Sequence, residues 1–146
     1  MKLKQITAGL VAVTMLGSNP IFAQSAPKVS GDVVKIGVLT DLSGAYSDLA
    51  GPGSVIAAKM AVADFSKDGT VLGKKIEVVS ADHQNKADIA ANKAREWYDK
   101  DNVDVIVDLV STNTALAVME VAEQKNKITL ISGAAPPQLP TRSARQ

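Results

Sequence analysis

The strongest signal for the fold lies in residues 33–53, which read VVKIGVLTDLSGAYSDLAGPG. An apolar, β-branched run leads into a stretch of Ser, Thr, Asp and Gly, and an amphipathic helical pattern follows. In α/β domains this order of residues builds a ligand-facing loop at the carboxyl end of the first strand. The segment therefore predicts an α/β domain whose first loop faces a ligand.

Strand and helix patterns alternate through the residues that follow. Apolar runs predict strands at residues 33–39, 75–81, 103–110 and 128–132. Helical spacing predicts helices from Pro52 to about residue 68, over residues 87–100, and from an N-cap at Ser111 or Thr112 to about Gln124. The fold class indicated is α/β, a doubly wound and mainly parallel sheet with right-handed crossovers.

The first 23 residues have the organisation of a secretory signal peptide. Lys2 and Lys4 give a positive start, and the apolar stretch at residues 6–17 is too short to span a bilayer. Ala23 is the small residue expected before the cleavage site. We therefore expect residues 1–23 to be removed on export, which would place the mature protein in the periplasm.

Three segments follow this signal. Residues 24–32 are polar, contain Pro and Gly, and are expected to form a linker. Residues 33–135 carry the alternating pattern and are expected to form the domain. Residues 136–146, PPQLPTRSARQ, hold three prolines and show no periodicity, although a further helix and strand are expected there. This tail is atypical, and a shifted reading frame in the gene is our hypothesis for it.

Composition narrows the class of protein. The chain has no Cys, so disulfides, thiolate metal ligands and a lipid anchor on Cys are excluded. Its 16 basic residues, two of them in the signal, stand against 15 acidic residues, and aromatic residues make up only 3%. Because there is no basic stripe and little aromatic surface for stacking on bases, no nucleic-acid partner is expected.

Motifs for nucleotide binding and for catalysis are missing from the sequence. No G-x-G-x-x-G follows the first predicted strand, and no G-x-x-x-x-G-K-[ST] occurs. The sequence has no Cys nucleophile and no G-x-S-x-G elbow, and it contains one His. We therefore expect neither an enzyme nor a cofactor.

The loops after the predicted strands are the candidate ligand contacts. They lie at residues 40–53, 82–86, 111–114 and 132–135, and three of them are rich in Ser, Thr or Gly. Helix N-termini at this edge offer free N–H groups that favour an anion such as a carboxylate. The same residue types also serve in ordinary caps and turns, so a structural role is favoured for each loop taken by itself.

Some other residues have two interpretations. His83 could act with Asp82 as an acid–base pair or as ligands, but a lone loop His is expected to be a polar surface residue. Asp108 could bind an amine at the end of the third strand, although a structural role is favoured. Trp97 and Tyr98 lie within the second predicted helix and are expected to pack against the core.

A family resemblance rests on three segments taken in order. They read KIGVLTDLSGAYSDLAGPGSVIAAKMAVADF, then GKKIEVVSADHQNKADIAANKAREWYD, then VDVIVDLVSTNTALAVMEVAEQKNKITLISGAA. Behind a signal peptide, this ordered set resembles the branched-chain amino-acid ABC-transporter substrate-binding proteins. These form the leucine/isoleucine/valine-binding group of the type I periplasmic binding proteins.

The resemblance implies two α/β lobes joined by a hinge, of which this chain would form an incomplete first lobe. It implies ligand contacts after the third strand, at Ser111 and the adjacent Thr112, and after the fourth, at Gly133 and Ala135. Ala135 would contribute its backbone, and an aromatic contact of some members falls near Leu49, with Tyr46 close by. The implied ligand is a small amino acid or related carboxylate, which is passed without any cofactor to the membrane subunits of an ABC permease.

Three alternatives to a transport function stay open at this point. A ligand-sensing receptor domain can have the same fold. A periplasmic enzyme would need a nucleophile and an acid–base set that the sequence does not offer. A non-functional remnant of a disrupted gene would also carry these segments.

Overall fold

The structure, a computed structural model, describes residues 29–134. The expected signal peptide at residues 1–23, most of the linker at residues 24–32, the tail at residues 136–146 and the candidate contact Ala135 lie outside the described residues.

Five strands form one sheet. They are β1 (Val34–Thr40), β2 (Thr70–Val71), β3 (Lys74–Asp82), β4 (Val105–Asp108) and β5 (Ile128–Ile131), in the spatial order β2-β3-β1-β4-β5. The pairs β3–β1, β1–β4 and β4–β5 are parallel, and the pair β2–β3 is antiparallel. The expected mainly parallel sheet is thus confirmed.

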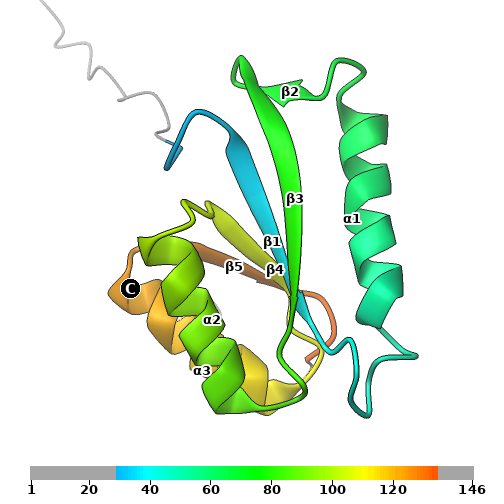
Figure 1. Ribbon diagram of the computed structural model, residues 1–146, viewed down its shortest axis with the longest axis vertical. Coiled ribbons are helices and arrows are strands. Elements are labelled where there is room, and N and C mark those ends of the chain that lie inside the picture. Colours follow the sequence, from blue (N-terminus) through cyan, green and yellow to red (C-terminus); the bar gives the residue numbers. More distant parts are fainter. Residues whose placement is uncertain (1–28, 135–146) are drawn as a thin grey trace, which may run out of the picture.

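Three helices connect these strands and cover both faces of the sheet. They are α1 (Gly51–Phe65), α2 (Ala87–Asp99) and α3 (Thr112–Gln124). In Figure 1, α2 and α3 lie together on one face, whereas α1 lies alone on the other. This arrangement is the doubly wound α/β fold that the alternation of strand and helix patterns predicted.

The sequence prediction differs from the structure in two strands. The antiparallel strand β2 was not expected; it forms because Leu72 and Gly73, with φ of 54° and 73°, make a two-residue turn into β3. Strand β4 is shorter than the expected 103–110. The Val103 N–H donates to the Trp97 carbonyl at the end of α2 (3.0 Å), and Asp108, with a φ of 86°, leaves the extended conformation.

The main core lies between the sheet and the α2/α3 layer. Its fully buried side chains include Leu39, Ile106, Leu109, Val118 and Val121. Trp97 and Tyr98 are buried in the same cluster, which confirms that they pack against the core.

One close approach fixes how α2 sits on the sheet. A Cβ at Gly37 would lie 2.5 Å from Cζ3 of Trp97, so only glycine lets the indole contact the backbone of β1. The Tyr98 hydroxyl donates to the Ile128 carbonyl (3.1 Å), and burial raises the pKa of this phenol above its usual range.

The opposite face of the sheet is less completely covered. Helix α1 is apolar around most of its circumference, yet Gly51 is its one buried residue, and 76% of Phe65 is exposed. An open apolar groove of about 460 Å³ lies between α1 and the sheet. It is lined by Val34, Ile36, Ala58, Ala61, Val62, Phe65, Val71, Ile76 and Val107. A helix that is apolar on all sides is usually buried, so α1 leaves more apolar surface uncovered than its sequence pattern leads one to expect.

Candidate functional site

The carboxyl ends of the parallel strands meet along one edge of the sheet. The register pairs Leu39 with Asp108 across β1 and β4, Thr40 with Asp82 across β1 and β3, and Asp108 with Ile131 across β4 and β5. The loops that follow these strands are therefore neighbours, as sequence reasoning assumed. In doubly wound sheets this edge is where ligands bind.

The first loop, residues 41–50, is folded around a buried carboxylate. Asp41 is fully buried, and its two oxygens accept the backbone N–H groups of Gly44 (2.7 Å) and Tyr46 (2.9 Å). A Cβ at Gly44 would lie 2.6 Å from these oxygens, so the turn requires glycine there. The Tyr46 carbonyl in turn accepts the N–H groups of Leu49 and Ala50, both at 3.0 Å. The loop is thus held in one conformation before any ligand arrives.

A second carboxylate joins this loop to the end of β3. Asp82 accepts the N–H groups of Leu42 (3.0 Å) and Gln84 (2.7 Å) through one oxygen and the Ser43 hydroxyl (2.6 Å) through the other. Burial by itself would raise the pKa of Asp82, but these hydrogen bonds outweigh it and lower the pKa below its usual value. Sequence reasoning considered Asp82 only as a partner for His83, and its role as a loop anchor was missed.

The expectation that His83 is a polar surface residue was wrong, because its side chain is fully buried. The backbone N–H of His83 donates to the Thr40 carbonyl (2.9 Å), and Nδ1 of its ring accepts the backbone N–H of Asn85 (3.0 Å). The turn from β3 into α2 therefore folds over the ring. Because Nδ1 is an acceptor, a neutral ring carries its proton on Nε2, and Nε2 is buried without a hydrogen-bond partner among the described residues.

The charge state of His83 follows from its surroundings. Burial lowers its pKa, which outweighs the opposing influence of the carboxylates of Asp41, Asp82 and Asp108. The imidazole is consequently neutral at pH 7. It is a buried donor beside acidic groups, and not a surface cation.

Ser111 precedes the first residue of α3 and occupies the predicted N-cap position, but its side chain does not cap the helix. Its buried hydroxyl is hydrogen bonded to Oδ1 of Asn113 (2.7 Å) and to the hydroxyl of Thr114 (2.8 Å). The first turn of α3, which begins at Thr112, has no side-chain cap and no acidic residue. Its free N–H groups and positive dipole end therefore stay available to an anion.

The segment after β5 packs against the loop that leads to α3. A Cβ at Gly133 would lie 3.0 Å from Cα of Val110, so only glycine lets the two backbones come this close. The Ser132 N–H donates to the Asp108 carbonyl (3.0 Å), and its hydroxyl donates to Oδ1 of Asp108 (2.7 Å). The structure thus brings the loops of Ser111 and Gly133 together.

Tyr46 lies in the first loop with 37% of its surface exposed. Its backbone is fixed by Asp41, whereas its side chain makes no described hydrogen bond to the loops of Ser111 and Gly133. The ligand-binding roles of Tyr46, Ser111, Thr112, Gly133 and Ala135 stay predictions.

The backbone is strained where β4 meets its loop. Asp108 and Leu109 have φ values of 86° and 61°, in the left-handed region that non-glycine residues seldom adopt. Such strain persists where surrounding contacts enforce it, and it is concentrated at functional sites. Neither residue was singled out for its conformation by sequence reasoning, since no local sequence signal marks it.

Within residues 29–134, no group of three or more His, Cys, Asp or Glu side chains could hold a metal ion. No helix in this range has both the length and the hydropathy needed to cross a membrane.

The sequence profile of the family described as periplasmic binding protein matches residues 33–144. No curated protein is significantly similar to the chain.

Solved structures give the same fold. A periplasmic binding protein from Burkholderia mallei is 53% identical, with a TM-score of 0.69, over 74% of this chain and 28% of its own. A branched chain amino acid ABC transporter periplasmic ligand-binding protein from Burkholderia xenovorans is 47% identical, with a TM-score of 0.68, over 72% and 28%. A solute binding protein of an ABC transporter from Rhodopseudomonas palustris, in complex with 3,4-dihydroxy benzoic acid, is 28% identical, with a TM-score of 0.61, over 72% and 28%. The chain thus spans little more than a quarter of the length of these proteins.

Proposed function

The chain belongs to the periplasmic binding protein family, and we propose that it is the amino-acid-binding part of the substrate-binding protein of an ABC transporter. The observation that carries this proposal is the uncapped, acid-free N-terminus of α3 with the Gly133 segment packed beside it. Free backbone donors at a helix start suit the carboxylate of an amino acid or a related small acid. The similarity to a branched chain amino acid ligand-binding protein supports the same ligand class.

Each candidate residue has a distinct role in this proposal. Ser111 and Thr112 offer hydroxyl and N–H donors to the ligand carboxylate, for which the Ser111 hydroxyl would turn away from Oδ1 of Asn113, and Gly133 lets the ligand approach the backbone. Ala135 contributes backbone groups, and Tyr46 contacts the ligand side chain from the first loop. No cofactor is required, because binding and release involve no covalent chemistry.

We further propose that residues 33–135 form only part of a first lobe. The support is the open apolar groove beneath α1 and the short share of the solved relatives that the chain covers. In a longer protein, a second lobe would close on the ligand and a further helix would cover the groove. Sequencing of the gene tests this idea. A shifted frame after residue 135 that continues as a second lobe is expected, and its absence would contradict the shifted-frame hypothesis.

The place of action is also part of the proposal. Residues 1–23 would direct export to the periplasm, and the full-length protein would pass its ligand to the membrane subunits of an ABC permease. Cell fractionation with an antibody to the chain should find it in the periplasm. Recovery from the cytoplasm alone would contradict this part of the proposal.

Titration calorimetry tests ligand binding by the purified chain. Leucine, isoleucine, valine and 3,4-dihydroxybenzoic acid form the ligand panel, and at least one should bind with an affinity of roughly millimolar, since one lobe leaves the ligand half solvated. Leucinamide, which lacks the carboxylate, should bind more weakly than leucine. Equal affinities for the two would show that the N-terminus of α3 does not hold a carboxylate.

A Ser111→Ala variant addresses the same contact from the protein side. Loss of the hydroxyl should weaken leucine binding about tenfold, which is typical of a hydrogen bond to a charged group. Ser80→Ala is the matched control, because Ser80 is exposed within β3 and away from the loops. An unchanged affinity in Ser111→Ala would remove this residue from the site.

A further inference from the structure

Asp108, the last residue of β4, connects the two loops on which the proposed site depends. Its carboxylate accepts the Ser132 hydroxyl (2.7 Å), and its carbonyl accepts the Ser132 N–H (3.0 Å). Ser132 is the first residue after β5 and precedes Gly133, while Ser111 follows Asp108 by three positions. One residue therefore holds both loops at the same point.

The backbone conformation of Asp108 is unfavourable for any residue with a side chain, so the presence of an aspartate here needs a separate explanation. With a φ of 86°, position 108 would suit glycine best, and the next residue is also left-handed, with a φ of 61°. A glycine would relieve the strain but would lose the bond to the Ser132 hydroxyl. The side chain, and not the backbone, is thus the reason for an aspartate here.

A second aspartate, at the other end of β4, shows what a purely structural carboxylate looks like. Asp104, just before β4, accepts the N–H groups of Ser30 (2.6 Å) and Lys35 (2.9 Å), one on each oxygen. Asp108 uses one oxygen on Ser132 and leaves its other oxygen buried without a hydrogen-bond partner among the described residues. Asp104 joins strand to strand, whereas Asp108 joins loop to loop.

We propose that Asp108 is a positioning residue of the ligand site, whose carboxylate locks the Ser132–Gly133 segment against the loop of Ser111 so that both present their donors in a fixed arrangement. The role of Asp108 in ligand binding rests on the proposed function. Its mechanical part, the lock itself, can be measured without any ligand. Locked loops bind more tightly because less freedom is lost when the ligand arrives.

The ligand-free test is amide hydrogen exchange in the intact chain. Asp108→Gly, which relieves the strained backbone, and Ser132→Ala should each speed exchange at the amide of residue 132, which donates to the Asp108 carbonyl, about tenfold or more, while core amides such as that of Val118 keep their protection. Asp104→Asn is the matched control and should leave exchange at Ser132 unchanged. If exchange at this amide is the same in all variants, the lock does not exist.

The binding test is calorimetry with leucine. Asp108→Gly and Ser132→Ala should each weaken binding about tenfold, the double variant should be no weaker than either, and Ser132→Thr, which keeps the hydroxyl, should restore affinity. Unchanged leucine affinity in both single variants overturns the positioning role. If wild-type protein binds neither leucine nor the rest of the panel, the proposed function fails, and the exchange measurement still decides whether the lock exists.

Discussion

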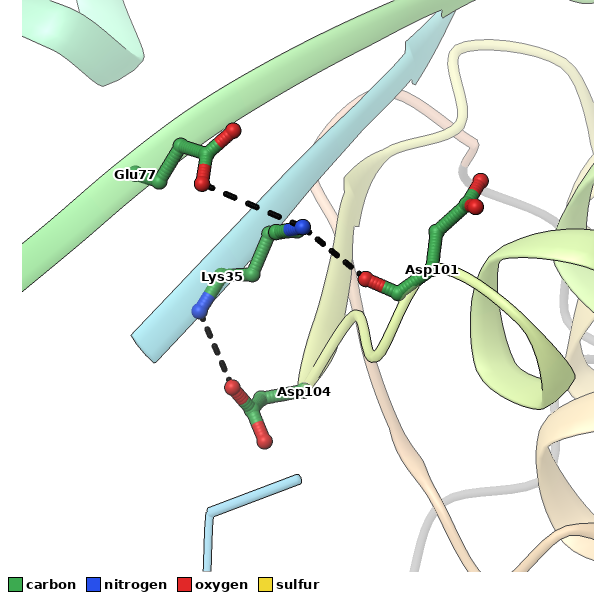
Figure 2. Close-up of polar contacts among 4 residues, drawn as sticks. All are labelled: Lys35, Glu77, Asp101 and Asp104. Atoms are coloured by element: carbon green, nitrogen blue, oxygen red, sulfur yellow. Dashed lines mark hydrogen bonds and ion pairs between the residues drawn. The ribbon is translucent and has the colours of Figure 1, made fainter. Parts of the chain in front are cut away.

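The polar groups at the two ends of the sheet differ in their burial and in their hydrogen bonding. At the amino end, the Lys35 ammonium lies between Oε2 of Glu77 (3.8 Å) and the Asp101 carbonyl (2.9 Å), and the backbone N–H of Lys35 donates to Oδ2 of Asp104 (2.9 Å), as Figure 2 shows. At the carboxyl end, Asp41, His83 and Asp108 are buried; the Asp41 carboxylate is hydrogen bonded, whereas Nε2 of His83 and Oδ2 of Asp108 have no described partner.

Under the proposed function, this difference separates polar groups that hold strands together from polar groups that prepare a site. At the amino end of β4, both oxygens of the Asp104 carboxylate are satisfied by the chain itself. Burial by itself would raise the pKa of Asp104, but the hydrogen bonds from Lys35 and Ser30 and the charge of Lys127 lower it. Unsatisfied buried groups at the other end cost stability, which a fold tolerates where those groups serve a ligand.

Among the tests of this comparison, removal of the buried carboxylate of Asp41 is expected to change the free energy of unfolding the most. Asp41→Ala leaves the N–H groups of Gly44 and Tyr46 without their acceptor, so the free energy of unfolding should fall by about 3 kcal/mol. Urea denaturation measures the loss. Asp48→Ala, in an exposed position of the same loop, should change the free energy by less than about 0.5 kcal/mol. Equal effects in the two variants would mean that the first loop is not organised by Asp41.

His83 gives the carboxyl end a pH dependence between pH 7 and pH 5, a range above the one in which Asp104 at the amino end titrates. Its pKa is lowered in the folded state, so the unfolded chain binds a proton first as the pH falls below about 6.5. Stability should therefore decrease from pH 7 downward, with a slope of at most about 1.4 kcal/mol per pH unit, and level off below the folded-state pKa.

The measurement is urea denaturation between pH 7 and pH 5, and the chain is suited to it because it holds one His. His83→Asn keeps an acceptor near the position of Nδ1 for the Asn85 N–H and should abolish the slope in this window. A slope that persists in the variant would assign the pH dependence to another group.

The smallest effect is expected from the ion pair at the amino end. Lys35→Met keeps the apolar stem but loses the contacts to Glu77 and to the Asp101 carbonyl, and it should lower the free energy of unfolding by no more than about 1 kcal/mol. Leucine affinity, measured by calorimetry, should not change. Weaker leucine binding would break the comparison, because it would show that the amino end also shapes the site.

Much of this architecture could be predicted from the sequence. Periodicity placed α2, α3 and the four longer strands, and strand order put the loops of Ser111 and Gly133 at one edge. The burial of His83 could not be predicted, because it depends on the turn that carries Asn85 over the ring. The short strand β2 was missed because two residues carry no measurable periodicity.

Local patterns were therefore sufficient for the fold class, the order of the elements and the edge at which the loops gather. They are sufficient because side-chain period, turn residues and the direction of parallel strands are properties of short segments. The lock between Asp108 and Ser132 and the contrast between the two ends of β4 arise from contacts 24 or more residues apart in the chain, such as the 24 positions from Asp108 to Ser132. Such contacts exist only once the sheet has formed, and they give the same residue type, aspartate, a structural role at one end of a strand and a positioning role at the other.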